Sequence, residues 1–217
     1  HEWKQESWKN LNSKVYKLFS GTLDNLSYQS SYAKKTTKVS NPNAATVITS
    51  DSAMKSVQSL KINKLATSGY LTGGKLEKAD GTEVTKDTTM GELLGLAEGG
   101  STTINVAIGG GDAKAIELTA DMKLSDFAGK LQELGLNANF DEATDRLFIG
   151  ASASGTANDF SITGDAAALL KLTKKAGAKK LAGEDAEIEL NGAIFTSNTN
   201  TFEINGLTIS CNAVTGD

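Results

Sequence analysis

Apolar residues near the start of the chain follow a helical spacing. Four of them are separated by three, four and three positions: Trp8, Leu11, Val15 and Leu18. This is the spacing of a heptad seam on one face of an α-helix, and Trp3 widens that face. We therefore expect a helical arm over the first ~35 residues. The five residues are called the seam below.

The seam has two interpretations: it packs on its own domain, or it pairs with a partner helix. The second is favoured because a long apolar stripe needs a matching surface, and the rest of the chain is expected to be mostly β. After a polar linker over 36–54, apolar residues alternate with polar ones in many short runs. Strands are expected at 57–65, 103–108, 115–119, 137–140, 146–149, 160–162, 188–190 and 194–195, and in the tail from 202 to 213.

Turn signals and helix caps divide these runs. Asn-Gly pairs at 191–192 and 205–206 and the Asp-Gly pair at 80–81 predict two-residue hairpin turns. Thr89 and Glu92 form a capping-box pattern that predicts a helix of about eight residues ending at Gly99. Further short helices are expected from a Ser125 cap to Gly135 and over 166–172, followed by an exposed lysine-rich connector at 174–180.

These elements predict an α+β fold that is mainly antiparallel β. The N-terminal helical arm precedes two β-rich domains, with the second inserted into the first. The expected boundaries are a helical arm and linker at 1–54, a discontinuous β-rich domain at 55–75 plus 183–217, and an inserted α+β domain at 76–182.

Composition excludes several classes of function. The chain has 217 residues with one His, His1, and one Cys, Cys211, so neither an internal disulfide nor a Cys/His zinc site is expected. Nucleophile pairs that use His are disfavoured for the same reason. A net charge of −4 and a single Arg, Arg146, argue against nucleic acid as a partner. No apolar run approaches the ~18 residues of a membrane span, so no membrane insertion is expected.

Several local patterns resemble sites but lack a required part. The Gly-Gly-Lys run at 73–75 is followed by Leu76, where a phosphate loop needs a hydroxyl. The glycines at 109–111 lead into a strand and not a helix. The acidic residues at 141–145 indicate a solvated hairpin tip, and those at 184–189 indicate the solvent-exposed face of a strand. Cys211 alternates with Leu207 and is expected to be buried. We expect no catalytic residue, cofactor or metal, and hence no enzyme.

Several short sequence motifs, taken in order, resemble those of the flagellar filament cap protein family, also called hook-associated protein 2. The motifs follow a long N-terminal helix and a Ser/Asn-rich break, and the likeness spans almost the whole chain. They are VQSLKINKLA (57–66), KLSDF (123–127), LGLNA (134–138), RLFIGAS (146–152), GTANDF (155–160), EDAEIELNG (184–192), TSNTNTF (196–202) and INGLTI (204–209). The family continues into C-terminal helices that pair with the first one, whereas this chain stops at Asp217. The resemblance thus implies a fragment that lacks those helices.

The resemblance implies a structural cap at the distal end of the bacterial flagellar filament. Members form ring-like homo-oligomers that hold arriving flagellin subunits and guide their folding and insertion. They are extracellular and leave through the flagellar type III system, which needs no cleaved signal peptide. The seam, Trp3, Trp8, Leu11, Val15 and Leu18, would support contacts in assembly. The alternative is a surface-exposed adhesin that recognises host glycan or protein; the Ser/Thr/Asn-rich turns suit it, but no aromatic platform is evident.

Overall fold

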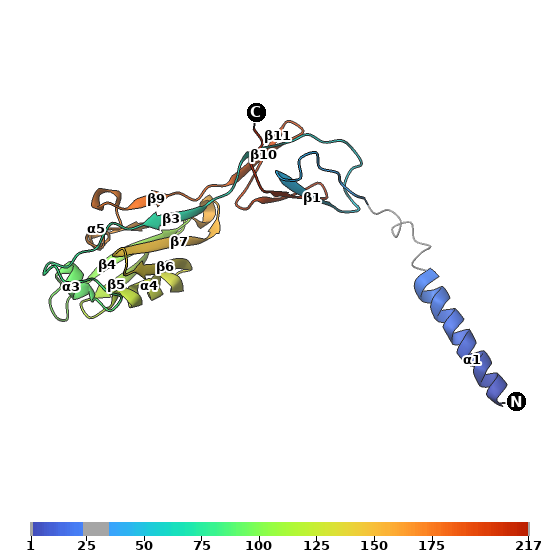
Figure 1. Ribbon diagram of the computed structural model, residues 1–217, viewed down its shortest axis with the longest axis horizontal. Helices are drawn as coiled ribbons and strands as arrows, with labels where there is room; N and C mark the ends of the chain where they lie inside the picture. Colours follow the sequence, from blue (N-terminus) through green and yellow to red (C-terminus); the bar gives the residue numbers. More distant parts are fainter. Residues whose placement is uncertain (1, 24–34, 217) are drawn as a thin grey trace. The chain divides into compact units, whose positions relative to one another are not determined.

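The computed structural model describes residues 2–23 and 35–216, and most of its regular elements are strands (Figure 1). The helices are α1 (Glu2–Lys17), the π-helical η1 (Leu18–Leu23), α3 (Met90–Leu94), α4 (Leu124–Glu133), η3 (Thr156–Asn158), α5 (Asp165–Leu169) and η4 (Lys174–Ala176). The strands are β1 (Ala45–Thr49), β2 (Leu60–Lys64), β3 (Ser68–Thr72), β4 (Ser101–Ile108), β5 (Lys114–Thr119), β6 (Leu136–Asp141), β7 (Arg146–Ser154), β8 (Phe160–Thr163), β9 (Lys179–Leu181), β10 (Ala186–Leu190), β11 (Ala193–Ser197), β12 (Thr201–Ile204) and β13 (Leu207–Cys211).

The strands form small sheets with antiparallel pairing. Their strand orders are β1-β13-β12, β11-β10-β2, β6-β7-β3-β9 and β5-β4-β8. Every strand pair whose register is known is antiparallel. The predicted α+β fold, mainly antiparallel β with an N-terminal helix, is therefore confirmed.

Backbone contacts divide the chain into two units. One contains residues 1–57 and 201–210, and the other contains 58–200 and 211–217. The first unit holds α1 and most of the β1-β13-β12 sheet, and the second holds the other sheets. The domain boundaries expected from the sequence are not tested by this division and stay a prediction.

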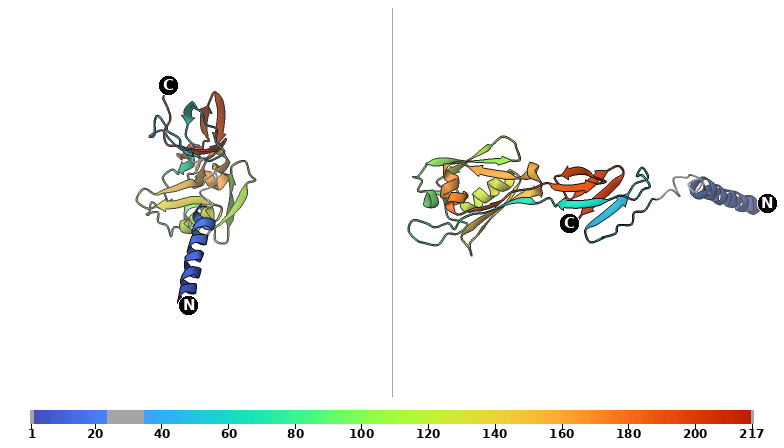
Figure 2. Two further views of the ribbon diagram at one scale, coloured as in Figure 1. Left: turned by 90° about the vertical axis from the view of Figure 1, so that its right-hand side faces the viewer. Right: turned by 90° about the horizontal axis from the view of Figure 1, so that it is seen from above.

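The larger unit has one continuous hydrophobic core. Its sheets β6-β7-β3-β9 and β5-β4-β8 contribute inward side chains, and α4 contributes Phe127 and Leu131, both fully buried. In the right-hand view of Figure 2, α4 and α5 lie among these strands. Burying side chains of this size stabilises a domain by roughly 1.5–3 kcal/mol each, which fixes the face that each strand turns outward.

Helix caps follow the predicted chemistry at one helix and differ at the next. At α3, Thr89 and Glu92 form the predicted capping box, but the helix ends at Leu94 because Gly95 adopts a left-handed φ of 71°. The expected end at Gly99 was wrong. At α4 the N-cap is Lys123, whose backbone N–H donates a hydrogen bond of 3.3 Å to the Asp126 carboxylate. Ser125 is therefore not the cap.

Tight turns separate the tail strands as predicted. The φ angles are 52° and 85° at Asn191 and Gly192, and 48° and 76° at Asn205 and Gly206. Two successive positive φ angles give the turn that matches the twist of a hairpin, here β10–β11 and β12–β13.

The Asp-Gly pair at 80–81 forms no hairpin, which corrects the prediction. No strand flanks it in the described chain. Instead the Asp80 carboxylate accepts hydrogen bonds from the N–H and hydroxyl of Thr82 at 2.9 and 2.7 Å. A short local turn of this kind satisfies the backbone without a second strand.

Three further expectations are corrected at strand boundaries. Val57 is fully exposed and lies outside β2, which begins at Leu60. The segment expected to be a polar linker at 36–54 contains β1, and the end of the lysine-rich connector, at 179–180, belongs to β9. Both strands are short, and their pairing with β13 and β3 overrides a local composition that favours loops.

Candidate functional site

The seam residues described in the structure are all strongly exposed. The exposed fractions are 78% for Trp3, 71% for Trp8, 53% for Leu11, 54% for Val15 and 55% for Leu18. A water-facing stripe of this size is unusual, because large apolar side chains normally lie inside. The structure thus leaves the apolar face of α1 without a covering surface among the described residues.

The seam surface contains a hollow of about 380 Å³. Trp8, Leu11 and Val15 line it together with Lys9 and Asn12. In paired helices, a side chain of one helix inserts between four residues of the other, and a hollow between seam residues is the matching shape. The geometry therefore suits a second helix, although which helix pairs with α1 stays a prediction.

Leu18 departs from the ideal seam. It begins the π-helical turn η1, whereas the other four residues lie on α1. A π-helical turn changes the angular step between residues, so Leu18 does not continue the 3.5-residue repeat. The predicted helix beyond 23 lies outside the described residues as far as 34.

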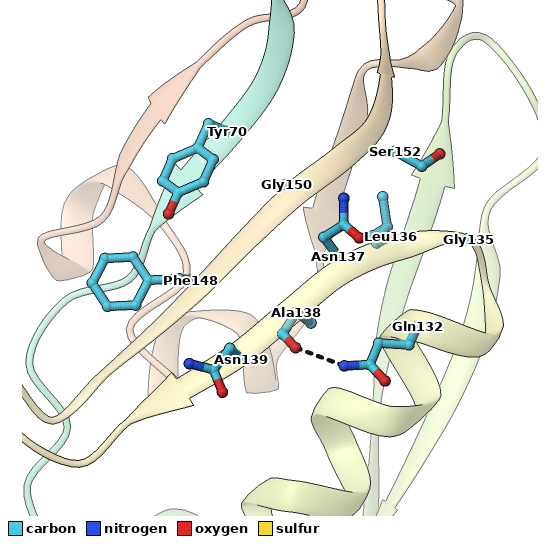
Figure 3. Close-up of a pocket in the computed structure, with 10 residues that line it drawn as sticks. All are labelled: Tyr70, Gln132, Gly135, Leu136, Asn137, Ala138, Asn139, Phe148, Gly150 and Ser152. Atoms are coloured by element: carbon cyan, nitrogen blue, oxygen red, sulfur yellow. Dashed lines mark hydrogen bonds between the residues drawn. The ribbon is translucent and has the colours of Figure 1, made fainter.

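A second candidate site lies on the outward face of the β6-β7-β3-β9 sheet. It is a groove of about 620 Å³ lined by ten residues, all labelled in Figure 3. The register places Asn137, Gly150 and Tyr70 in one row across β6, β7 and β3. Phe148 and Asn139 form the next row on β7 and β6. We call this feature the sheet groove.

The sheet groove combines aromatic and amide side chains. Figure 3 shows Tyr70 and Phe148 on adjacent strands at one end and Asn137 and Asn139 along β6. At the rim, the Gln132 side chain donates a hydrogen bond of 2.8 Å to the carbonyl oxygen of Ala138. Tyr70 and Phe148 are distant in sequence, and the pairing of β3 with β7 brings them to one face of the sheet.

The glycine runs serve the fold and do not form phosphate loops. The N–H groups of Gly73 and Gly74 donate to the carbonyl oxygens of Leu147 and Lys171 at 2.8 and 2.7 Å. The Gly109 N–H donates to the Asp159 carbonyl oxygen at 2.5 Å. These donors are occupied and do not point together at an anion.

The acidic hairpin tip is held by local partners. Asp141 accepts from the Thr144 hydroxyl at 2.6 Å, and Glu142 accepts from the Lys86 N–H at 2.8 Å. Asp145 lies 3.6 Å from the Lys75 ammonium. Within residues 2–23 and 35–216, no three His, Cys, Asp or Glu side chains are grouped to hold a metal ion.

The second acidic run joins neighbouring segments. Glu184 pairs with the Lys64 ammonium at 3.0 Å, and Glu187 accepts from the Asn63 amide at 3.0 Å. Asp185 accepts two hydrogen bonds from Thr156. These carboxylates therefore have structural partners.

Cys211 is buried with 4% of its surface exposed, as its alternation with apolar residues predicted. Desolvation raises the pKa of its thiol, so the reactive thiolate is disfavoured. Separately, none of the described helices has the length and apolar character needed to cross a membrane.

Comparisons with known proteins give one match to a family model and several structural matches. Residues 1–69 match the family model described as the flagellar hook-associated protein 2 N-terminus. No curated protein matches the chain. The chain is similar to the flagellar cap protein FliD D2-D3 domains from Escherichia coli, with 18% identity and a TM-score of 0.61 over 80% of this chain and 91% of that one.

Two other solved structures show the same likeness. The D2-D3 domains from Serratia marcescens are 20% identical, with a TM-score of 0.61 over 80% of this chain and 95% of that one. The D1-D2-D3 domains from Escherichia coli are 19% identical, with a TM-score of 0.64 over 87% of this chain. The chain spans 57% of that three-domain structure. At these identities the structural likeness shows the fold.

Proposed function

We propose that this chain, a member of the flagellar hook-associated protein 2 family, forms part of the cap at the distal end of the bacterial flagellar filament. Membership rests on the match of residues 1–69 to the family model, and the fold of the remaining chain is that of the D2-D3 domains. The family is a structural one without enzymatic activity. The cap role of this chain is inferred from the family.

The exposed seam is the observation that carries the proposal. Trp8, Leu11 and Val15 leave more than half of their surface in water. Covering one such side chain contributes roughly 1.5–3 kcal/mol, and tryptophans commonly dominate the energetics of an interface. The seam therefore supports a role in assembly, in which α1 pairs with another helix within the cap.

In the finer form of the proposal, copies of the full-length protein assemble into a ring-like homo-oligomer. The β-rich domains, at 55–75 with 183–217 and at 76–182, would act as rigid supports beside the growing end. Arriving flagellin subunits would be held there while they fold and insert. Cys211 is the sole cysteine, so no internal disulfide hinders passage as an unfolded chain through the flagellar type III channel to the extracellular tip.

The experiment is a deletion of the gene for this protein in its source organism. Filaments and unpolymerised flagellin in the medium are then measured together. We expect cells without filaments and flagellin released into the medium, with both defects restored by the intact gene. Normal filaments would contradict the proposal, and lost surface attachment with normal filaments would favour the adhesin alternative.

The contribution of the seam is tested by complementing the deletion with a variant that carries Trp8→Ser, Leu11→Ser and Val15→Ser. The matched control carries Glu6→Ala and Lys17→Ala, which lie on the same helix but do not line the seam hollow. We expect the seam variant to be secreted yet to leave flagellin in the medium, and the control to restore filaments. Full restoration by the seam variant would remove the seam from the proposal.

A further inference from the structure

The two Asn-Gly pairs of this chain differ in what holds the asparagine side chain. The pairs 191–192 and 205–206 each form the two-residue turn of a hairpin, and both asparagines are exposed. Asparagine before glycine readily loses ammonia without an enzyme, because glycine has no Cβ to hinder attack on the asparagine side chain. We propose that Asn205 is a site of spontaneous deamidation and isoaspartate formation, whereas hydrogen bonds protect Asn191. This inference does not rest on the cap function.

The reaction needs only the turn itself and water. The Gly206 nitrogen loses its proton to solvent and attacks Cγ of Asn205; a new N–Cγ bond forms, the Cγ–Nδ2 bond breaks, and ammonia leaves. Water then opens the resulting succinimide ring at either of its two carbonyl carbons. Opening at Cγ gives aspartate, and opening at the main-chain carbonyl carbon gives isoaspartate, in which the main chain runs through the former side chain. Either product carries one new negative charge.

The attacking nitrogen is equally available in both pairs. Each hairpin ladder closes at the strand residues that flank its turn. In the described part of the chain, neither Gly192 nor Gly206 donates its N–H in a hydrogen bond. The φ angles are also alike, at 52° and 85° in the first pair and 48° and 76° in the second. Sequence, turn geometry and exposure therefore do not separate the two sites, and the contacts of the side chains do.

Neighbouring residues hold the Asn191 side chain at both atoms of its amide. Its Nδ2 donates to Oε1 of Gln58 at 3.1 Å, and its Oδ1 accepts the N–H of Ser59 at 2.9 Å. The Asn191 N–H also donates to the carbonyl oxygen of Ser59 at 2.9 Å. Turning the side chain toward the Gly192 nitrogen breaks both side-chain hydrogen bonds, which slows the attack by about tenfold or more.

The Asn205 side chain lacks this restraint. Among residues 2–23 and 35–216, none forms a hydrogen bond with its amide. The turn is held instead on the carbonyl side of Gly206, whose oxygen accepts the Ser50 N–H at 2.8 Å. The attack uses the nitrogen of Gly206 and the side chain of Asn205, and this contact leaves both free. Asn205 is therefore the asparagine expected to react.

The close fit of Gly206 lets the modification change the local structure. An added Cβ at Gly206 would lie 2.7 Å from the backbone nitrogen of Ala53 and from the hydroxyl oxygens of Ser50 and Ser52. Isoaspartate at position 205 inserts an extra carbon atom into the main chain directly before this residue. We expect Gly206 to shift, so that the Ser50 N–H, which directly follows β1, loses its acceptor.

Two variants test the protection and the consequence separately. Gln58→Ala removes one partner of the Asn191 amide, so we expect Asn191 to react several-fold faster while the rate at Asn205 is unchanged. Freshly prepared Asn205→Asp adds the charge without the extra main-chain carbon. Its Ser50 N–H should exchange with solvent as slowly as in the fresh wild type, and that of the aged wild type faster. An unchanged Asn191 rate in Gln58→Ala would refute the protection, and unchanged Ser50 exchange in the aged chain would refute the consequence.

The central test follows both turns in one sample. The folded chain is aged at pH 8 and 37 °C in ¹⁸O-enriched water, which labels every succinimide that hydrolyses. A glutamate-specific protease at pH 4 then cuts after Glu189 and Glu203 and puts the two turns on separate fragments for mass spectrometry. We expect Asn205 to convert at least ~10-fold faster than Asn191, and the two rates to converge in urea, where the hydrogen bonds are lost. Equal rates in the folded chain, or faster conversion of Asn191, would overturn the proposal.

Discussion

The backbone N–H and the hydroxyl of Thr156 both donate to the carboxylate of Asp185, at 2.7 and 2.9 Å. Thr156 begins η3 one residue after the end of β7, and Asp185 directly precedes β10. Nearby, the Ser154 hydroxyl donates to the carbonyl oxygen of Asn198 at 2.8 Å. These contacts fasten the end of β7 to both ends of the β10–β11 hairpin, so the larger unit is braced where two of its sheets meet.

Asp185→Ala should lower the free energy of unfolding by about 1 kcal/mol, because two hydrogen bonds at a partly exposed position are lost. Urea unfolding followed by far-UV circular dichroism measures the change. Glu98→Ala, at an exposed loop position, is the control and should change little. A stability equal to that of the control would show that the brace contributes nothing.

Gly155→Ala should destabilise the chain by more than ~2 kcal/mol. The position has a φ of 91°, and an added Cβ would lie 2.5 Å from the Cβ of Asn198. Gly129→Ala is the matched control: it lies in α4 with open space around it, and should stabilise by about 0.5–1 kcal/mol. Thermal unfolding compares the two. Equal melting temperatures would contradict the close approach at Gly155.

The ion pair between Asp159 and Lys180 should make stability depend on acid pH. Burial alone would raise the pKa of Asp159, but the Lys180 ammonium and the N–H groups of Phe160 and Gly183 outweigh it and lower the pKa. The Lys180 ammonium also lies 4.3 Å from the centre of the Phe160 ring. Because the pKa of Asp159 is lowered, its carboxylate is charged at neutral pH, and the ion pair stabilises the folded chain there.

That contribution is lost as the pH falls through the folded-state pKa, between about pH 5 and pH 2. Asp159→Asn should therefore be less stable than the wild type at pH 7, with a difference that shrinks toward pH 2. Unfolding free energies across this range check the trend. A difference that is constant with pH would show that the carboxylate charge has no role.

Cys211 should resist thiol reagents in the folded chain. Its side chain is buried, which limits the access of a reagent to the sulfur. Burial also raises the pKa of the thiol, which lowers the fraction present as thiolate. At pH 8 we expect modification by a chromogenic disulfide reagent to be slower than in urea by on the order of 100-fold. Equal rates in both conditions would place the thiol at the surface.

Local signals in the sequence predicted local features well. The Thr89–Glu92 capping box and the Asn205-Gly206 turn depend only on neighbouring residues, and the structure confirms both. The hairpin predicted at the Asp-Gly pair 80–81 was wrong, because the same residues also form a turn without strands. The Asp80 carboxylate holds that turn by accepting hydrogen bonds locally. A turn signal therefore predicts a reversal of the chain, and only a partner strand makes it a hairpin.

Features that depend on long-range pairing were not predictable. Tyr70 and Phe148 lie on one face of a sheet only because β3 and β7 are neighbours in it. The three residues of β9 carry two lysines and became a strand through pairing with β3. By contrast, the apolar stripe of the seam was visible in the sequence, because four of its five residues lie on one helix at regular spacing. The exposure of that stripe comes from the structure.

The cap assignment is tested most directly by locating the protein on intact filaments. Antibody fragments against the β-rich part, coupled to gold, are imaged on purified filaments by electron microscopy. The account predicts label at one end of each filament, the end distal to the cell, and none along the shaft. Label along the shaft or on the cell body, with unlabelled distal ends, would contradict it.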